Sequence, residues 1–149
     1  MKKQIVGTIF LLLAVLLSVA GMVIYWVNAH GEYYNDFTPS VMLYAAFGVV
    51  ALLAWKVLSV TLGEKRWMDV LYLLAAILLA WAAVDFLGDR VESAAIILGS
   101  QLEAGNALAQ QSLFTSFAGI GCFILGMILT GVSSFFQTTE ADAQNVERE

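Results

Sequence analysis

The sequence predicts an all-α, polytopic membrane protein in which four transmembrane helices form an antiparallel bundle. Composition is the first reason: 60% of the 149 residues are hydrophobic and only 13% are charged, which is far more apolar than a soluble domain. The second reason is a set of long apolar runs, each near the roughly 20 residues that a helix needs to cross a bilayer. These runs are residues 5–27, 40–62, 67–88 and 113–136.

The first run follows Lys2 and Lys3, and its residues 18–20 resemble the cleavage site of a secretory signal. The apolar residues continue through 22–27, however, which makes the run longer than the apolar region of a signal peptide. It also closes with Trp26, a residue type enriched at membrane–water interfaces. We therefore predict that the run is retained as the first transmembrane helix.

The basic residues predict the orientation of the helices. Lys65 and Arg66 lie in the short turn between the second and third runs, and Lys2 and Lys3 precede the first. Because short cytoplasmic loops are enriched in lysine and arginine, both chain ends and this turn are predicted to lie inside a cell membrane, N-in and C-in. The outer connections then hold Glu32, Asp36, Asp89, Glu92 and Glu103, with Arg90 and a neutral His30.

The connection at 89–112 contains an apolar run that is too short to span the membrane. Its apolar residues recur at spacings of three and four, which places them on one face of a helix. They are Val91, Ala94, Ala95, Leu98 and Leu102. The pattern fits either an outward extension of the third helix or a helix lying on the membrane surface. We predict a short outer amphipathic helix between helices three and four, with breaks at Gly99 and Gly105.

The C-terminal end is acidic and shows no apolar periodicity; its acidic residues include Glu140, Asp142, Glu147 and Glu149. A segment that cannot bury apolar surface stays disordered. The prediction is therefore a four-helix transmembrane domain, residues 1–137, followed by a disordered acidic cytoplasmic tail, residues 138–149.

Three carboxylates form a stripe at the outer end of the third helix, because Asp85, Asp89 and Glu92 stand at i, i+4 and i+7. Like charges at this spacing repel, and the C-terminal half of a helix disfavours anions. Exposure to water, a base such as Arg90, or a bound cation with oxygen ligands would offset the repulsion. Asp85 is the deepest of the three and the best candidate for function, since an acid inside a membrane is a functional hypothesis by default.

Two further charges lie near the inner turn. Lys56 is about a turn and a half inside the predicted end of the second helix, and Asp69 opens the third. A charge within a membrane segment is costly unless it pairs, reaches the interface or faces water. We predict that Lys56 and Asp69 either form an ion pair in the inner leaflet or reach the membrane interface separately. The functional alternative is that one of these charges lines a water-filled path.

The fourth run carries small residues at every fourth position, namely Ala118, Cys122, Gly126, Thr130 and Ser134. In lipid, helices associate through close backbone approach and hydrogen bonds, which small residues permit. The row is predicted to be a helix-packing face, either inside one chain or between subunits.

The remaining residue types exclude several kinds of chemistry. Cys122 is the single cysteine and His30 the single histidine, so one chain holds no disulfide, thiolate metal cluster, two-histidine haem site or multi-histidine zinc site. The sequence has neither a phosphate-binding glycine loop nor the serine elbow of hydrolases. We predict no enzyme activity, no catalytic or metal-binding residue and no cofactor. No basic patch supports nucleic acid as a partner.

The four-helix layout and the stretch from Asp89 to Ile97, which reads DRVESAAII, resemble uncharacterised small four-helix integral membrane proteins of bacteria. The resemblance implies the same fold and location and transfers no functional residue. Claudins and tetraspanins share the helix count, but their cysteine-paired outer loops have no counterpart in this sequence.

These patterns predict a non-enzymatic membrane protein that self-associates or stabilises a larger membrane complex as an accessory subunit. Its partners would be the lipid bilayer and a second copy or another membrane protein. The alternative is a protomer of a small oligomeric channel or transporter, related to cations. Several copies would be needed for that role, because four helices in one chain usually pack a closed core.

Overall fold

The structure, a computed structural model, consists of helices joined by short connections. It describes the backbone of residues 2–63, 65–100, 103 and 105–146, and the side chains of residues 5–63, 65, 67–100, 103 and 105–136. The elements are α1 (Lys2–Ala29), α2 (Pro39–Leu62), the short 3₁₀ helix η1 (Arg66–Met68), α3 (Asp69–Gly99) and α4 (Ala107–Val146). Each of the four α-helices is long and apolar enough to cross a membrane, which supports a multi-pass membrane protein.

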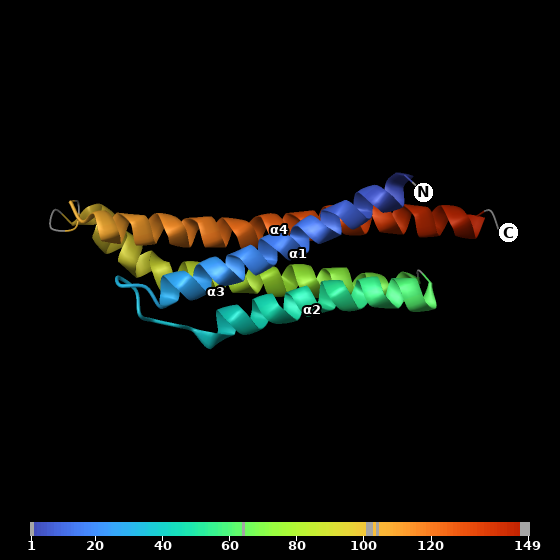
Figure 1. Cartoon of the computed structure of the whole chain (residues 1–149). Helices are drawn as coiled ribbons and strands as arrows, with labels where there is room; N and C mark the ends of the chain where they lie inside the picture. Colours follow the sequence, from blue (N-terminus) through green and yellow to red (C-terminus); the bar gives the residue numbers. More distant parts are fainter. Residues whose placement is uncertain (1, 64, 101–102, 104, 147–149) are drawn as a thin grey trace.

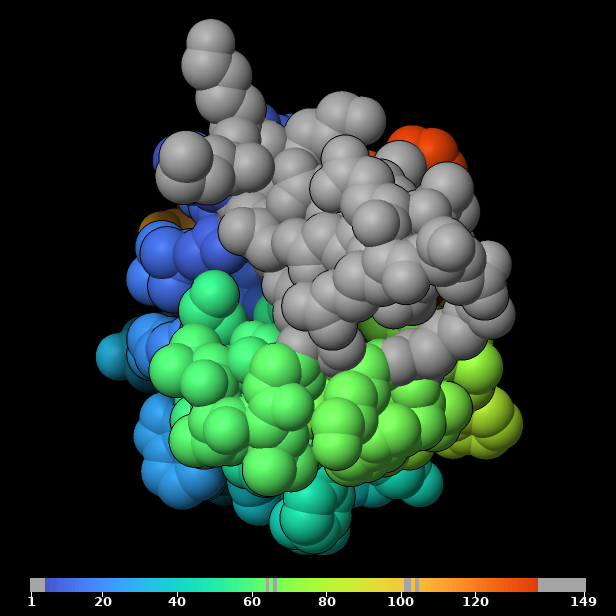
Figure 2. Space-filling view, turned by 90° about the vertical axis from the view of Figure 1, so that its right-hand side faces the viewer, coloured from blue at the N-terminus to red at the C-terminus, as the bar shows by residue number. Residues whose placement is uncertain are grey.

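Successive helices run antiparallel, so both chain ends lie at the same end of the bundle (Figure 1). We call this the terminal end, and the opposite end, which holds residues 30–38 and the α3–α4 connection, the loop end. Helix α1 packs most extensively on α4, while α3 packs on both α2 and α4. Contact between α1 and α2 is sparse by comparison. Figure 2 looks onto the terminal end, where the end of α2 lies between α1 and α3.

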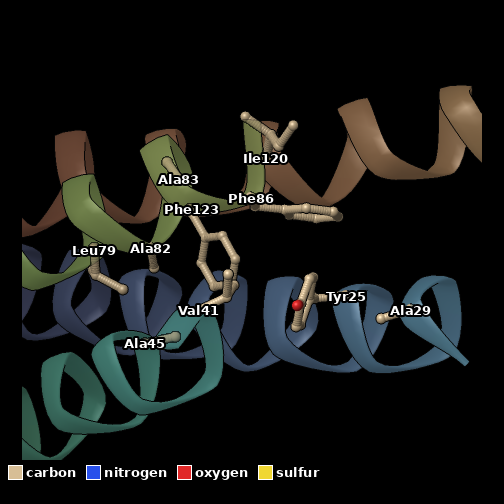
Figure 3. Packing of buried hydrophobic residues seen from close by; sticks show 10 residues of the cluster. All are labelled: Tyr25, Ala29, Val41, Ala45, Leu79, Ala82, Ala83, Phe86, Ile120 and Phe123. Atoms are coloured by element: carbon tan, nitrogen blue, oxygen red, sulfur yellow. The ribbon is translucent and has the colours of Figure 1, made fainter. Parts of the chain in front are cut away.

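The buried residues of the helices follow alternating steps of three and four. In α1 they include Leu11, Ala14, Ser18, Gly21, Tyr25 and Asn28, and in α4 they include Ala109, Leu113, Ser116, Ile120 and Phe123. This spacing keeps one face of each helix toward its neighbours in a left-handed bundle. Figure 3 shows the rings of Tyr25, Phe86 and Phe123 filling the space between helices, and Tyr25 meets Phe86 edge to face at 4.7 Å between centroids.

Local sequence explains where α2 begins and ends. Pro39 occupies the first turn, where a missing N–H is not needed by the helix. The preceding residue, Thr38, is held by the Tyr25 hydroxyl, which accepts from the Thr38 N–H at 2.6 Å and donates to its carbonyl at 3.1 Å. At the other end Gly63 has φ 73°, a backbone conformation that favours glycine, and the chain turns back toward α3.

Helix α3 does not stop near Gly88, as the apolar run suggests, but continues to Gly99. Residues 91–99 are therefore an extension of α3 at the loop end, and the described part of the connection from 100 to 106 holds no separate amphipathic helix. The buried face of the extension also differs from the predicted one. Ile97 packs against Ala109 and Leu113 of α4, while Val91 and Leu98 are exposed.

Helix α4 is longer than predicted at both ends. It begins at Ala107, where the preceding Asn106 accepts the Ala109 N–H at 3.2 Å with its side chain, as N-cap residues do. Its backbone stays helical to Val146, through most of the segment predicted to be a disordered tail. Residues 137–146 contain neither glycine nor proline, and adding residues to an existing helix requires no new nucleation.

Candidate functional site

Arg90 is the least expected residue of the structure. The sequence places it among the charges of an outer connection, but it lies on α3 with a fully buried side chain. A buried charge strongly destabilises a protein unless it is paired and hydrogen-bonded. The surroundings of Arg90 therefore define the candidate site.

Asp36 supplies the opposite charge, from the segment that joins α1 to α2. Its carboxylate receives two hydrogen bonds from the guanidinium, from Nη1 at 2.6 Å and from Nη2 at 3.0 Å. Nη1 also donates to the Asp89 carbonyl at 3.3 Å. The Asp36 side chain is 46% exposed, whereas that of Arg90 is 0% exposed. The pair thus joins a buried cation to a carboxylate that water still reaches.

The Nε atom of Arg90 faces the opposite way, into the bundle. It donates toward Asn28 Oδ1 of α1 at 3.1 Å and Ser116 Oγ of α4 at 3.2 Å. The Ser116 hydroxyl lies 2.8 Å from Asn28 Oδ1, and the Asn28 amide donates to the Ser112 carbonyl at 2.8 Å. These bonds connect α1, α3 and α4 around one guanidinium group.

Aromatic rings cover the faces of the guanidinium. Its central carbon lies 3.9 Å from the centroid of the Tyr34 ring and 5.6 Å from that of Phe86, distances at which a cation is attracted to a π face. Burial raises the pKa of the Tyr34 phenol, so the ring stays neutral at physiological pH. We call Asn28, Tyr34, Asp36, Arg90 and Ser116 the arginine cluster.

The three predicted carboxylates lie in three different environments. Asp85 Oδ2 accepts from Ser40 Oγ of α2 at 2.7 Å, beside the N-terminus of that helix, where the backbone dipole favours an anion. Glu92 is exposed. Asp89 Oδ2 is buried and has no hydrogen-bond partner among the described residues. Because α3 continues to Gly99, these acids do not stand at its C-terminus as the sequence suggested.

The charges near the inner turn lie far from the arginine cluster. The Lys56 ammonium donates to Thr8 Oγ1 of α1 at 3.3 Å, so this charge reaches a neighbouring helix within the bundle. Asp69 begins α3 and has an interaction partner of its own. The predicted pairing of Lys56 with Asp69 stays a prediction.

The small residues of α4 do not share one environment. Gly126 and Thr130 are buried, Cys122 and Ser134 are partly buried, and Ala118 is exposed. A row at every fourth position turns by roughly 40° per step around a helix of 3.6 residues per turn, so it cannot stay on one contact face. At its centre the approach is close: a Cβ atom on Gly126 would lie 2.9 Å from Ser18 Oγ of α1.

Sequence reasoning missed the arginine cluster because it ended the third helix too early. The buried residues Tyr72, Leu79, Phe86 and Ile97 lie on one face of α3, and Arg90, four residues after Phe86, continues it. Extending the helix through the charged residues would have pointed Arg90 inward. The partners Asn28, Asp36 and Ser116 come from other elements and carry no comparable local pattern.

Among the side chains that the structure describes, no group of three or more histidine, cysteine, aspartate or glutamate residues could hold a metal ion. Comparisons with protein-family models, curated proteins and solved structures give no match. The resemblance to small bacterial four-helix proteins therefore stays a prediction, and function has to be inferred from the geometry of the chain.

Proposed function

We propose that the chain is a non-enzymatic integral membrane protein that acts as an accessory or self-associating subunit of a membrane complex. The observation that carries this proposal is that the arginine cluster joins helices to one another. Arg90 is fully buried, and apart from one bond to the Asp89 carbonyl its described hydrogen bonds go to protein groups on α1, α4 and the α1–α2 segment. Such an arrangement supports a rigid scaffold, because the bonds of Arg90 to Asn28, Asp36 and Ser116 fix separate elements to one another.

The interior below the arginine cluster supports the same proposal. Tyr25, Leu79, Phe86 and Phe123 belong to one buried apolar cluster to which all four α-helices contribute (Figure 3). The buried Ser18, Thr130 and Ser133 each donate to a backbone carbonyl oxygen, at distances of 2.7 to 2.8 Å. Polar groups that are already bonded in this way provide no continuous lining for water or ions.

The channel alternative therefore requires an assembly in which several copies enclose the path. Asp85 is the residue that keeps this alternative open, because its carboxylate is only partly buried and lies between α2 and α3. Flux through the purified protein in liposomes tests it, as described in the Discussion.

We further propose that the terminal end is cytoplasmic and the loop end faces outward, in a cell membrane. Lys65 is exposed in the turn at the terminal end, and basic short loops stay inside. The test uses single cysteines at Lys65 and Glu32, both exposed, in a Cys122→Ala background. An impermeant maleimide applied to intact cells should label position 32 and spare position 65. Labelling of 65 alone would reverse the orientation.

The subunit role is tested by the size of the native particle. The protein is extracted from its own membranes in polymer nanodiscs, which preserve neighbouring proteins, and its mass is measured by light scattering. We expect a particle that contains more protein than one 16.2 kDa chain. A particle holding one chain, whatever the expression level, would refute both self-association and the accessory role.

A further inference from the structure

The outward extension of α3 carries an apolar stripe that the bundle does not use. Val91 is 58% exposed and Leu98 is 74% exposed, and Ala95 between them is exposed as well. These residues stand at i, i+4 and i+7 and therefore share one face. The residues of the extension that pack inward lie on a different face: Arg90 and Ile97 are buried and Ala94 is partly buried.

The stripe lies beyond the part of α3 that the bilayer covers. Counting from Asp69, the roughly 20 residues that cross a hydrocarbon core end near Gly88. The exposed carboxylate of Glu92, about one helical turn beyond Gly88, also lies outside the hydrocarbon core, because an ionised side chain avoids hydrocarbon. Figure 1 shows α3 and α4 reaching past the ends of α1 and α2 at the loop end. The extension thus has α4 on one side and no helix of the α1–α2 hairpin on the other.

An apolar stripe outside the bilayer indicates a contact surface. The lipid-facing side of α3 continues into it without interruption, since Val84 and Leu87 are also exposed. A spacing of four and three residues is the seam of a two-helix contact. A partner that contacts both the lipid-facing side of α3 and the stripe would be a helix that crosses the membrane and continues beyond its outer surface.

Charge decides between a second copy and a different partner. The loop end exposes the carboxylates of Glu32 and Glu92, whereas the charges of Arg90 and Asp36 cancel in their ion pair. Pairing the stripe with its own copy would bring two Glu92 side chains and two acidic ends together. Complementary potentials favour association and like charges oppose it.

We propose that Val91, Ala95 and Leu98 form the docking stripe for a helix of a different membrane protein, whose apolar residues are flanked by lysine or arginine above the outer membrane surface. This inference rests on the proposed accessory role and names the contact through which that role is performed.

The first test uses a defined probe. A synthetic helix with leucines at the seam positions and lysines beside them is titrated onto the protein in nanodiscs of zwitterionic lipid. Saturable binding is expected, and Leu98→Ser or Glu92→Lys should each weaken it about tenfold. Ile96→Ser is the matched control, because Ile96 is 51% exposed on the same helix but about 160° around from Leu98. Equal binding of a glutamate-flanked helix, or equal loss in the Ile96 variant, would overturn the proposal.

A single cysteine at position 98, in a Cys122→Ala background, tests two other occupants of the stripe, a second copy of this chain and lipid. A disulfide-linked dimer in native membranes would identify a second copy as the occupant and overturn the proposal. Quenching of a fluorophore at this cysteine by a spin label in the acyl chain would place the stripe in hydrocarbon and overturn it as well. The native particle size then distinguishes failure of the docking stripe from failure of the accessory role. If the particle is large and Leu98→Ser does not change its size, the docking stripe is refuted and the accessory role is retained. If the particle holds one chain, both proposals are refuted.

Discussion

Replacing Asp36 with asparagine removes the counter-charge of Arg90 while keeping the size and shape of the side chain. Breaking a buried ion pair by neutralising one partner costs about 3–5 kcal/mol when the other charge stays buried. Arg90 is 0% exposed, but Asp36 is 46% exposed, so water can replace part of the lost carboxylate. We therefore expect Asp36→Asn to lower the free energy of unfolding by about 2–3 kcal/mol.

Replacing Arg90 with methionine should cost less, although Arg90 is the more buried partner. The variant removes the charge itself, and the half-exposed Asp36 carboxylate is then solvated by water. Asn28 and Ser116 keep the hydrogen bond between them. The loss of the remaining hydrogen bonds and ring contacts amounts to about 1–2 kcal/mol. The double variant should resemble Arg90→Met alone, which makes the two changes non-additive by about 2 kcal/mol.

The measurement is reversible unfolding in mixed micelles with increasing sodium dodecyl sulfate, followed by tryptophan fluorescence. Glu32→Gln, an exposed change in the same segment, should stay within about 0.5 kcal/mol of the parent. If Arg90→Met were more damaging than Asp36→Asn, or if the two effects were additive, the view of Arg90 as a buried charge that requires Asp36 would be wrong.

Other variants test the packing and the acidic residues. Gly126→Ala should destabilise the bundle by about 1–3 kcal/mol, because its Cβ would lie 2.9 Å from Ser18 Oγ. A Cβ atom at Gly121 would meet no neighbouring atom. Gly121→Ala should therefore be neutral or slightly stabilising in thermal unfolding. Equal melting temperatures for the two variants would show that α1 does not pack closely on Gly126. Asp85→Asn should leave the free energy of unfolding within about 1 kcal/mol of the parent, since the partly exposed side-chain oxygen still accepts from Ser40. Neither the parent nor Asp85→Asn should show cation flux in proteoliposomes. Flux in the parent that is lost in Asp85→Asn would favour the channel alternative.

The membrane-spanning helices were predictable because each is encoded locally. An apolar run of sufficient length specifies a helix in lipid regardless of what surrounds it. The four runs lie within the four α-helices apart from residues 67 and 68, which belong to η1. Helix ends were less predictable. The end of α3 lies beyond four charged residues at 85, 89, 90 and 92. The hydropathy of the sequence falls at these residues, although the helix and its buried face continue past them.

The arginine cluster was not predictable from single residues, because its partners lie far apart in the sequence. Asn28 and Ser116 are separated by 88 positions, and Asp36 and Arg90 by 54. Taken alone, Arg90 resembles a charge at the membrane interface. A pair with its sequence neighbour Asp89 or Glu92 is a simpler interpretation than a pair with the distant Asp36. Extending the buried face of α3 points Arg90 inward, but only the packed arrangement of α1 and α4 beside α3 shows which groups its guanidinium meets.

The origin of these partners suggests what the arginine cluster does during assembly. Asn28 and Asp36 belong to the α1–α2 hairpin, and Arg90 and Ser116 belong to the α3–α4 hairpin. The described bonds of the cluster therefore join the two hairpins to each other. In lipid there is little hydrophobic drive for hairpins to associate, so packing and hydrogen bonds have to select one arrangement. The close approach of Gly126 to Ser18 supplies the packing within the bundle, and the arginine cluster fixes the register at the loop end.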